Sequence, residues 1–200
     1  MPDRRPDLKQ TLIEALSAPG RASSDYDLNQ NVTLPADRVL RPAAVLIAVR
    51  EETQTLLLTK RSTALKHHPG QVAFPGGKID PGDGGPVDAA LREAREEIGL
   101  PESQVEVLGT LPPHETVTSY AMTPVLGVLR GDFTPVIEVG EVSEAFEVPF
   151  HHVIDPSRFH IERRHWRGTE RRYYTVTYGP YYIWGATARI LAALSDRIAR

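Results

Sequence analysis

The segment from Arg92 to Leu100 constrains the fold of this chain most, because it has the pattern of a helix with two chemically different faces. It reads REAREEIGL. An apolar stripe is formed by Val87, Ala90, Leu91, Ala94 and Ile98. Another face carries three glutamates, with Glu93 and Glu97 one turn apart and Glu96 beside them. The pattern predicts a helix that packs on one side and presents concentrated carboxylates on another.

Three carboxylates so close together repel one another, and a divalent cation would remove that repulsion. Mg²⁺ takes oxygen ligands, usually a few carboxylates with water and substrate phosphate. Such an ion neutralises phosphate oxygens and activates a water nucleophile. Arg92 is expected to pair with Glu96 at the i, i+4 spacing and to orient it. Taken alone, however, this helix is better explained as a solvated charged surface, since exposure is the usual state of charged residues.

Two stretches rich in glycine and proline precede this helix in the sequence. Residues 61–77 and 79–86 are rich in them, so we expect loops there, with a short strand near 72–74. The helix itself is expected over residues 87–98, closed by Gly99. Further strands are expected at 43–49, 55–59, 104–111, 122–129 and 145–149 and in a hairpin of 159–166 with 172–178, and further helices at 7–17 and 184–198. This order predicts an α+β domain with a mixed sheet.

The composition excludes several functional classes. A net charge of -3 argues against a general nucleic-acid binder, which would have a basic excess. Without cysteine, disulfides and thiolate chemistry are excluded. The first residues lack the apolar run of a signal peptide, and no stretch approaches the ~20 apolar residues of a membrane span. We therefore expect a cytoplasmic protein that binds neither nucleic acid nor a membrane.

The sequence before and within this helix resembles the signature of the Nudix hydrolases. Its second half reads Arg-Glu-apolar-any-Glu-Glu-any-Gly-apolar, and residues 92–100 match every specified position. The first half departs. When Gly76 and Gly77 are aligned with the usual pair of glycines, Asp83 stands where the signature has Glu, and the loop has one extra residue before the helix. The departure does not touch the three glutamates.

The resemblance implies a fold, a cofactor and a metal site. The Nudix fold is a mixed β-sheet sandwiched between helices. The implied cofactor is Mg²⁺ or Mn²⁺. By resemblance Glu93, Glu96 and Glu97 are the metal ligands and catalytic carboxylates, the carbonyl of Gly77 completes the metal shell, and Arg92 belongs to the catalytic group.

Two further roles stay open at this point. Nudix enzymes often recruit the general base from outside the signature, and both Glu115 and Glu144 are candidates for it. Tyr120 is a candidate for stacking on adenine, with ordinary packing as an equal alternative, because aromatic side chains serve both uses.

Residues 57–77 resemble a motif that accompanies the Nudix signature in coenzyme A diphosphatases. This upstream motif reads LLTKRSTALKHHPGQVAFPGG. The residues that match at the family spacing are Leu57, Leu58, Thr59, Arg61, Ser62, Gly70, Phe74, Pro75, Gly76 and Gly77. Lys66 stands where the motif has Arg, which keeps the charge and loses the planar fork.

The upstream motif also makes physical sense as a substrate loop. Arg61 and Lys66 are suited to charge-assisted bonds with phosphates. Gly76 and Gly77 let the backbone approach a ligand closely. Phe74 is a further candidate for substrate contact, with a plain core residue as the alternative. Each of these residues alone is more often structural, and their common order is what favours substrate binding.

The resemblance implies hydrolysis of the coenzyme A diphosphate to 3′,5′-ADP and 4′-phosphopantetheine. The alternative enzyme acts on another nucleotide, such as an oxidised nucleoside triphosphate, a dinucleotide or ADP-ribose. Other classes are an idle Nudix domain that binds a nucleotide as a regulator, and a structural α+β domain. We expect a helix and lead-in segment in residues 1–40 and the Nudix domain in residues 41–200. A small-molecule substrate is the expected partner, and a homodimer is expected because dimers are common among relatives.

Overall fold

A mixed sheet carries most of the apolar runs of the sequence. The structure is a computed structural model that describes residues 7–35, 37–166 and 168–199. In these residues nine strands form the large sheet: β1 (Ser23–Ser24), β2 (Arg41–Arg50), β3 (Thr55–Arg61), β4 (Val72–Ala73), β5 (Gly76–Lys78), β6 (Val105–Thr110), β7 (His114–Glu115), β8 (Tyr120–Leu129) and β9 (Val142–Pro149). Its main path is β1-β7-β8-β2-β3-β4, and β5, β6 and β9 pair with β2, β8 and β3.

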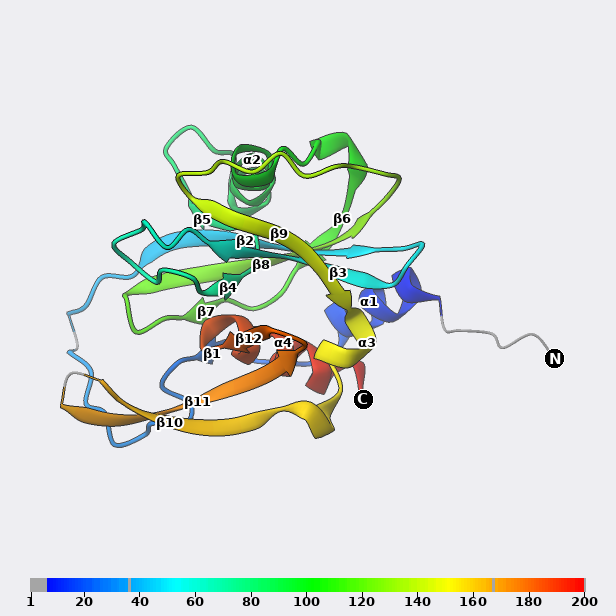
Figure 1. Cartoon of the computed structure of the whole chain (residues 1–200). Coiled ribbons are helices and arrows are strands. Elements are labelled where there is room, and N and C mark those ends of the chain that lie inside the picture. Colours follow the sequence, from blue (N-terminus) through cyan, green and yellow to red (C-terminus); the bar gives the residue numbers. More distant parts are fainter. Residues whose placement is uncertain (1–6, 36, 167, 200) are drawn as a thin grey trace.

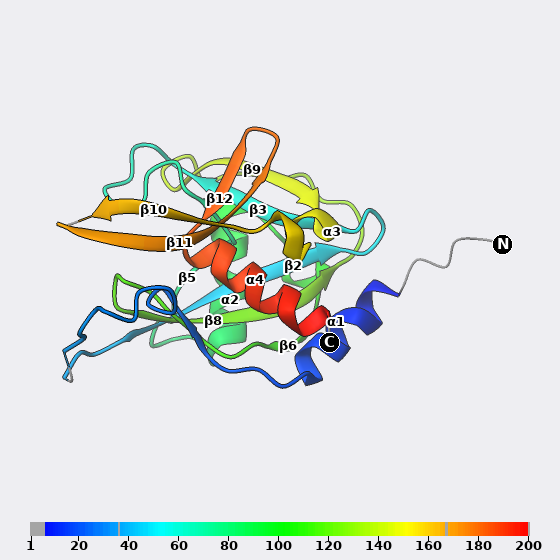
Figure 2. The same cartoon turned by 90° about the horizontal axis from the view of Figure 1, so that it is seen from below.

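Helices and a second sheet cover the two faces of the large sheet (Figure 1). The helices are α1 (Leu8–Ser17), α2 (Pro86–Ile98), the short α3 (Phe150–Val153) and α4 (Ala186–Ile198). The second sheet has the order β10 (His160–Trp166), β11 (Thr169–Tyr178) and β12 (Tyr181–Trp184). Helix α2 lies on one face of the large sheet, and α1, α4 and the second sheet lie on the other, as the view from below shows (Figure 2). The predicted α+β fold with a mixed sheet between helices is confirmed.

The central strand β2 is buried on both faces, which explains its unbroken apolar sequence. It pairs in parallel with β8 along its whole length, from Arg41 opposite Tyr120 to Arg50 opposite Leu129. Its even-numbered residues, such as Leu46, contribute to the core under α2. Its odd-numbered residues, such as Ile47, contribute to the core under α1 and α4. One strand therefore joins the two cores of the molecule.

Helix α2 begins and ends as the sequence predicts. Pro86 occupies its first turn, where a missing N–H costs nothing. Gly99 ends it with a left-handed φ of 70°, and its N–H donates to the carbonyls of Ala94 and Arg95. The buried alanines of its apolar stripe are short enough for close contact with the large sheet. The acidic face, Glu93, Glu96 and Glu97, is thus fixed relative to β2 and β5.

Two local expectations were wrong. The glycine pair of the upstream motif lies in β5 rather than in a loop, because Gly76 and Gly77 pair with Val45 and Ala44 of β2. The last helix begins at Ala186 and not at 184, since Tyr181–Trp184 forms β12 beside β11.

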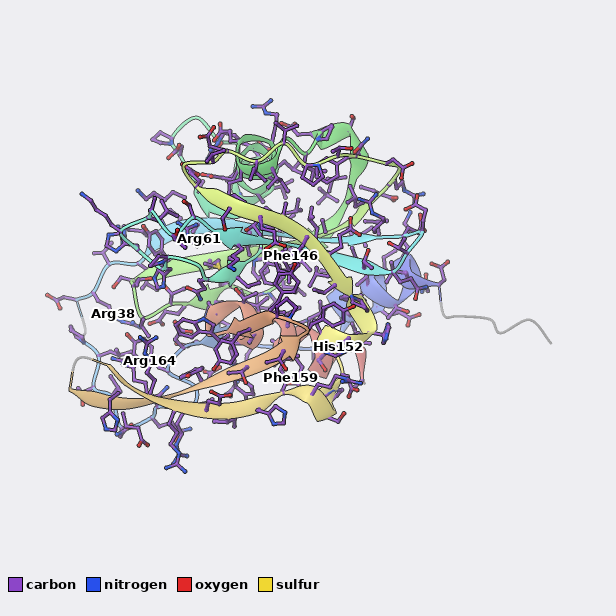
Figure 3. The ribbon with its side chains drawn as sticks, viewed as in Figure 1. Arg38, Arg61, Phe146, His152, Phe159 and Arg164 are labelled. Atoms are coloured by element: carbon purple, nitrogen blue, oxygen red, sulfur yellow. The ribbon has the colours of Figure 1, made fainter. Side chains whose placement is uncertain are left out.

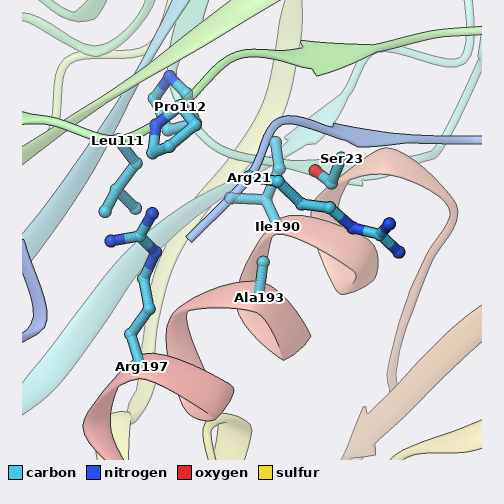
Figure 4. A pocket seen from close by; sticks show the side chains of 8 residues that line it. Arg21, Ser23, Leu111, Pro112, Ile190, Ala193 and Arg197 are labelled. Atoms are coloured by element: carbon cyan, nitrogen blue, oxygen red, sulfur yellow. The ribbon is translucent and has the colours of Figure 1, made fainter. Parts of the chain in front are cut away.

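The first described residues cover the large sheet together with the last helix. Asp7 caps α1 by accepting a hydrogen bond from the N–H of Gln10 at 3.2 Å. The guanidinium of Arg197 in α4 donates to the carbonyls of Ala15 and Ala18, at the end of α1. Arg197 also lines a cavity of about 10 Å³, room for roughly one water (Figure 4). The boundary between residues 1–40 and 41–200 stays a prediction. No helix of the described residues is long and apolar enough to cross a membrane.

Candidate active site

Glu97 is the most unusual carboxylate of the acidic face, because it is almost fully buried without a cation beside it. Only 3% of the residue is exposed. One carboxylate oxygen accepts a hydrogen bond from the N–H of Gly76 at 3.2 Å, and no lysine, arginine or histidine of the described residues lies within ion-pair distance. Burial raises the pKa of Glu97 to about 7, while the N–H of Gly76 and the charge of Arg61 oppose that rise.

The carboxylate of Glu93 lies against the backbone of Gly77. A Cβ atom at Gly77 would lie 2.5 Å from that carboxylate, so a larger residue here would displace the end of the Glu93 side chain from its present position. Burial raises the pKa of Glu93, and Arg92, at 3.1 Å from its carboxylate, opposes that rise. The structure therefore brings together Gly76, Gly77, Glu93 and Glu97, four of the residues that the sequence singled out.

Arg92 ties the acidic face to the loop before α2. Its guanidinium donates to both carboxylate oxygens of Asp83, at 2.9 and 3.0 Å, and to Glu96 at 2.9 Å, which is the predicted i, i+4 pair. The ion pair lowers the pKa of Asp83. Asp83 thus reaches the arginine despite its shorter side chain and the longer loop. Glu96 lies outermost in the acidic face, with 54% of its side chain exposed.

Glu141 is a fourth carboxylate at this site, and the sequence gave no reason to select it. Its charge raises the pKa of both Glu93 and Glu97. Its carbonyl accepts a hydrogen bond from the N–H of Ser62 at 2.8 Å. The loop before it is fastened to the end of α2, where the N–H of Glu138 donates to the carbonyl of Glu97 at 2.8 Å.

The substrate loop begins beside the acidic face. Arg61 ends β3, and its backbone exchanges hydrogen bonds with Gln71 and Gly70. The positive charge of Arg61 lowers the pKa of Glu97, against the effect of burial. Lys66 is exposed on the loop between Arg61 and Gln71. Phe74 is only 3% exposed and belongs to the core under α4.

Neither predicted candidate for the general base joins the acidic face. Glu144 accepts a hydrogen bond from the hydroxyl of Tyr181 at 2.6 Å, next to the stacked rings of Phe146 and Tyr181 (Figure 3). Glu115 forms an ion pair with Arg38. Among the largest influences on the pKa values of Glu93 and Glu97 is the charge of Glu141, which raises both.

The donor set fits a hard divalent cation. Carboxylate oxygens of Glu93 and Glu97 and the carbonyl of Gly77 are the kind of ligand that Mg²⁺ and Mn²⁺ prefer. The described residues contain no group of three side chains at the spacing of a finished metal site. A cation here would therefore complete its shell with water and substrate oxygens, which is usual for Mg²⁺.

Comparison with known proteins identifies the family. The NUDIX domain matches residues 39–167. The chain belongs to the Nudix family. A protein named Nudix hydrolase NudL, uncharacterized, from Escherichia coli (strain K12) is 45% identical over 159 residues, which cover 79% of this chain and 83% of the relative. The NudL protein of Enterobacter sp. (strain 638) is 43% identical over the same shares.

Among solved structures, the MutT protein of Methanosarcina mazei Go1 is 18% identical, with a TM-score of 0.49 over 60% of this chain and 84% of that chain. The Nudix family generally uses divalent metals. The chain is accordingly a Nudix hydrolase that acts on a diphosphate substrate.

Proposed function

We propose that this Nudix hydrolase cleaves the diphosphate of coenzyme A, releasing 3′,5′-ADP and 4′-phosphopantetheine. The observation that carries the proposal is the direct contact between the upstream motif and the acidic face. Gly76 donates to Glu97, Gly77 lies against Glu93, and the charge of Arg61 reaches Glu97. The motif that resembles coenzyme A diphosphatases thus forms one wall of the site and not a distant surface.

Glu93 and Glu97 would hold Mg²⁺ or Mn²⁺, with the carbonyl of Gly77 and the more exposed Glu96 beside them. When bound, such a cation neutralises phosphate oxygens and lowers the pKa of a coordinated water. The charge of the cation would also stabilise the ionised form of Glu97, whose pKa is raised because the carboxylate is buried without a positive partner. Arg92 keeps Glu93 and Glu96 in place through its bond to Asp83.

The remaining residues would bind and orient the substrate. Arg61 is placed to bind a diphosphate oxygen through charge-assisted bonds. Lys66, on the exposed part of the loop, would add a mobile positive charge. Glu141 would take a proton from the attacking water, since it is exposed to solvent and its charge acts on both Glu93 and Glu97. Glu144 is placed less well, because it already accepts the hydroxyl hydrogen of Tyr181.

A substrate panel tests the proposal. Coenzyme A, ADP-ribose, a dinucleotide and a nucleoside triphosphate are incubated with the full chain and Mg²⁺ or Mn²⁺, and the products are identified by mass spectrometry. We expect 3′,5′-ADP and phosphopantetheine well above the turnover of the other compounds. Cleavage of another compound with coenzyme A intact would overturn the substrate and favour the alternative nucleotide diphosphatase. If nothing is cleaved, binding of a nucleotide as a regulator becomes the better explanation.

A variant of Arg61 tests whether this residue of the substrate loop acts in substrate binding rather than in the reaction step. Arg61→Gln is expected to raise KM for coenzyme A more than it lowers kcat, because it removes a bond to phosphate that exists before the reaction. Arg158→Gln, an exposed arginine far along the chain, is the matched control. An unchanged KM in Arg61→Gln would remove this arginine from the proposed substrate contacts.

A further inference from the structure

One arginine at the end of the large sheet is held in place while its charge is left unbalanced. Arg41 is the first residue of β2 and is exposed. Its guanidinium lies over the ring of Tyr120, 4.0 Å from the ring centre, and donates to the carbonyl of Thr118 at 3.0 Å. No carboxylate of the described residues lies within ion-pair distance of it. Arg38, three residues before, is by contrast paired with Glu115.

The turn of residues 116–120, which contacts the Arg41 side chain, is fixed by its own hydrogen bonds. Ser119 has a left-handed φ of 63°, which is uncommon for a residue other than glycine. The turn is nevertheless closed, since Tyr120 donates its N–H to the hydroxyl of Thr116 and Ser119 donates its N–H to the carbonyl of Thr116. The N–H of Arg41 in turn donates to the carbonyl of Ser119 at 2.9 Å. Strain of this kind persists where the surroundings fix a conformation, which is common at ligand sites.

The position of Arg41 relative to the acidic face follows from the strand register. Ala44, three residues further along β2, pairs with Gly77, which lies against Glu93. Three residues of strand span about 10 Å along β2. Because alternate residues of a strand point to opposite faces, Arg41 shares its face with Val45 and Ile47, so a ligand that contacts both Arg41 and the acidic face would pass the end of β2. The first end of β2 (Figure 1) lies on the side of the molecule where Arg38 and Arg61 are labelled (Figure 3).

We infer that Arg41, held flat by Tyr120, binds a phosphate monoester on the nucleotide part of the substrate. This inference rests on the proposed function, because coenzyme A carries such a phosphate at the 3′ position of its ADP part. A phosphate monoester carries a charge of about −2 at neutral pH, and a guanidinium matches it with two parallel hydrogen bonds. Tyr120 is then a positioning residue, because its ring fixes the plane of Arg41. This proposed role differs from both adenine stacking and ordinary packing, the two alternatives that the sequence left open.

Binding of small nucleotides tests the inference without hydrolysis. Calorimetry in metal-free buffer compares adenosine 3′,5′-bisphosphate with adenosine 5′-monophosphate. The natural protein should bind the bisphosphate roughly tenfold or more tightly than the monophosphate, the usual strength of a hydrogen bond to a charged group. Arg41→Gln should lose that preference, and Arg163→Gln, an exposed arginine of β10, should keep it. A preference that survives in Arg41→Gln, or none in the natural protein, overturns the inference.

The role of Tyr120 has its own test. Tyr120→Phe retains the ring and should retain the preference for the bisphosphate, whereas Tyr120→Leu should lose most of it at an unchanged melting temperature. Equal preferences in the two variants would contradict a positioning role.

Hydrolysis then separates this inference from the proposed function. Coenzyme A and its 3′-dephospho form share the same diphosphate and differ in the monoester. Arg41→Gln should raise KM for coenzyme A roughly tenfold while leaving KM for the dephospho form within about twofold. If the natural protein cleaves neither compound, the proposed function fails, and the binding series still decides the role of Arg41.

Discussion

Glu97 and Glu147 are two partly or fully buried carboxylates that differ in what balances their charge. Glu147 accepts hydrogen bonds from the guanidinium of Arg50 at 2.7 and 2.9 Å, and also one from Thr55. Glu97 is more deeply buried and receives only a backbone N–H. The buried carboxylate of Glu147 is compensated by its arginine. Burying a carboxylate without such a partner costs desolvation free energy that no contact within the folded protein offsets. The contrast supports the proposal that Glu97 belongs to the metal site, while Glu147 stabilises the fold.

The largest expected effect compares isosteric changes at these two positions. Glu97→Gln should lower kcat with a diphosphate substrate by about 10³-fold, the scale of removing a charge that stabilises the transition state, and should keep or increase the free energy of unfolding. Glu147→Gln should do the reverse, with near-normal kcat and a loss of about 1–3 kcal/mol in stability. Kinetics and urea unfolding of both variants are the measurements. Normal activity in a folded Glu97→Gln protein would contradict the assignment.

The pH dependence of stability sharpens the same contrast. The pKa of Glu97 is raised from 4.5 to about 7 in the folded protein, so between these values the folded state binds a proton that the unfolded state has lost. Stability of the metal-free protein should therefore fall as pH rises from about 4.5 to 7, by up to about 3 kcal/mol, and change little above. Urea midpoints across this range, in a chelator, measure it. The fall should shrink strongly in Glu97→Gln, where only the raised pKa of Glu93 still contributes, and persist in full in Glu147→Gln. A slope equal in all three proteins would assign it to other groups.

Much of the fold follows from local patterns that the sequence contains. The helix of α2 and its glycine cap depend on residues within a few positions of one another, and so do the apolar strands β2, β3 and β8. β5 was missed because Gly76 and Gly77 have no strand propensity; they extend only because β2 offers them an edge. The start of α4 was misplaced because Trp184 continues an apolar run that pairs with β11 instead.

The sequence predicted only those site residues that lie close to one another along the chain. Glu93, Glu96 and Glu97 share one helix, so spacing alone brings them together, whereas Gly76 and Gly77 reach them because β5 pairs with β2. Glu141 lies in a distant loop, which is tied to the helix by the hydrogen bond from the N–H of Glu138 to the carbonyl of Glu97. The periodicity of apolar residues in a sequence does not predict a long-range backbone contact of this kind. The sequence also could not show that Glu144 is engaged by Tyr181, since that pair depends on how β12 packs beside β9.

A smaller effect is expected from the pair that supports the acidic face. Asp83→Asn keeps the size of the side chain and removes the charge that holds Arg92. Because such supporting residues typically contribute 10–100-fold, we expect activity to fall by about that factor with metal affinity weakened in parallel. Activity and Mn²⁺ titrations measure both. Asp196→Asn, at an exposed position of α4, is the matched control. Equal losses in the two variants would mean that the bond between Asp83 and Arg92 is not what supports activity.

The smallest effect is expected on the exposed loop. Lys66→Arg restores the residue of the family motif and gives phosphate a planar fork. Because the position is exposed, the gain should be modest, about two- to fivefold in KM for coenzyme A. The gain should shrink as salt concentration rises, since exposed charges are screened. A KM that is unchanged at low salt would place Lys66 outside the substrate contacts.

Calorimetric titration of the natural protein and of Glu97→Gln with Mn²⁺ tests the central claim most directly. The claim is that a divalent cation supplies the charge that Glu97 lacks. Near pH 7 part of the Glu97 population carries a proton, so binding should release protons, which buffers of different ionisation enthalpy detect. We expect Mn²⁺ binding with proton release in the natural protein, and its loss in Glu97→Gln. Absence of binding in the natural protein, or equal binding in both, would contradict the account.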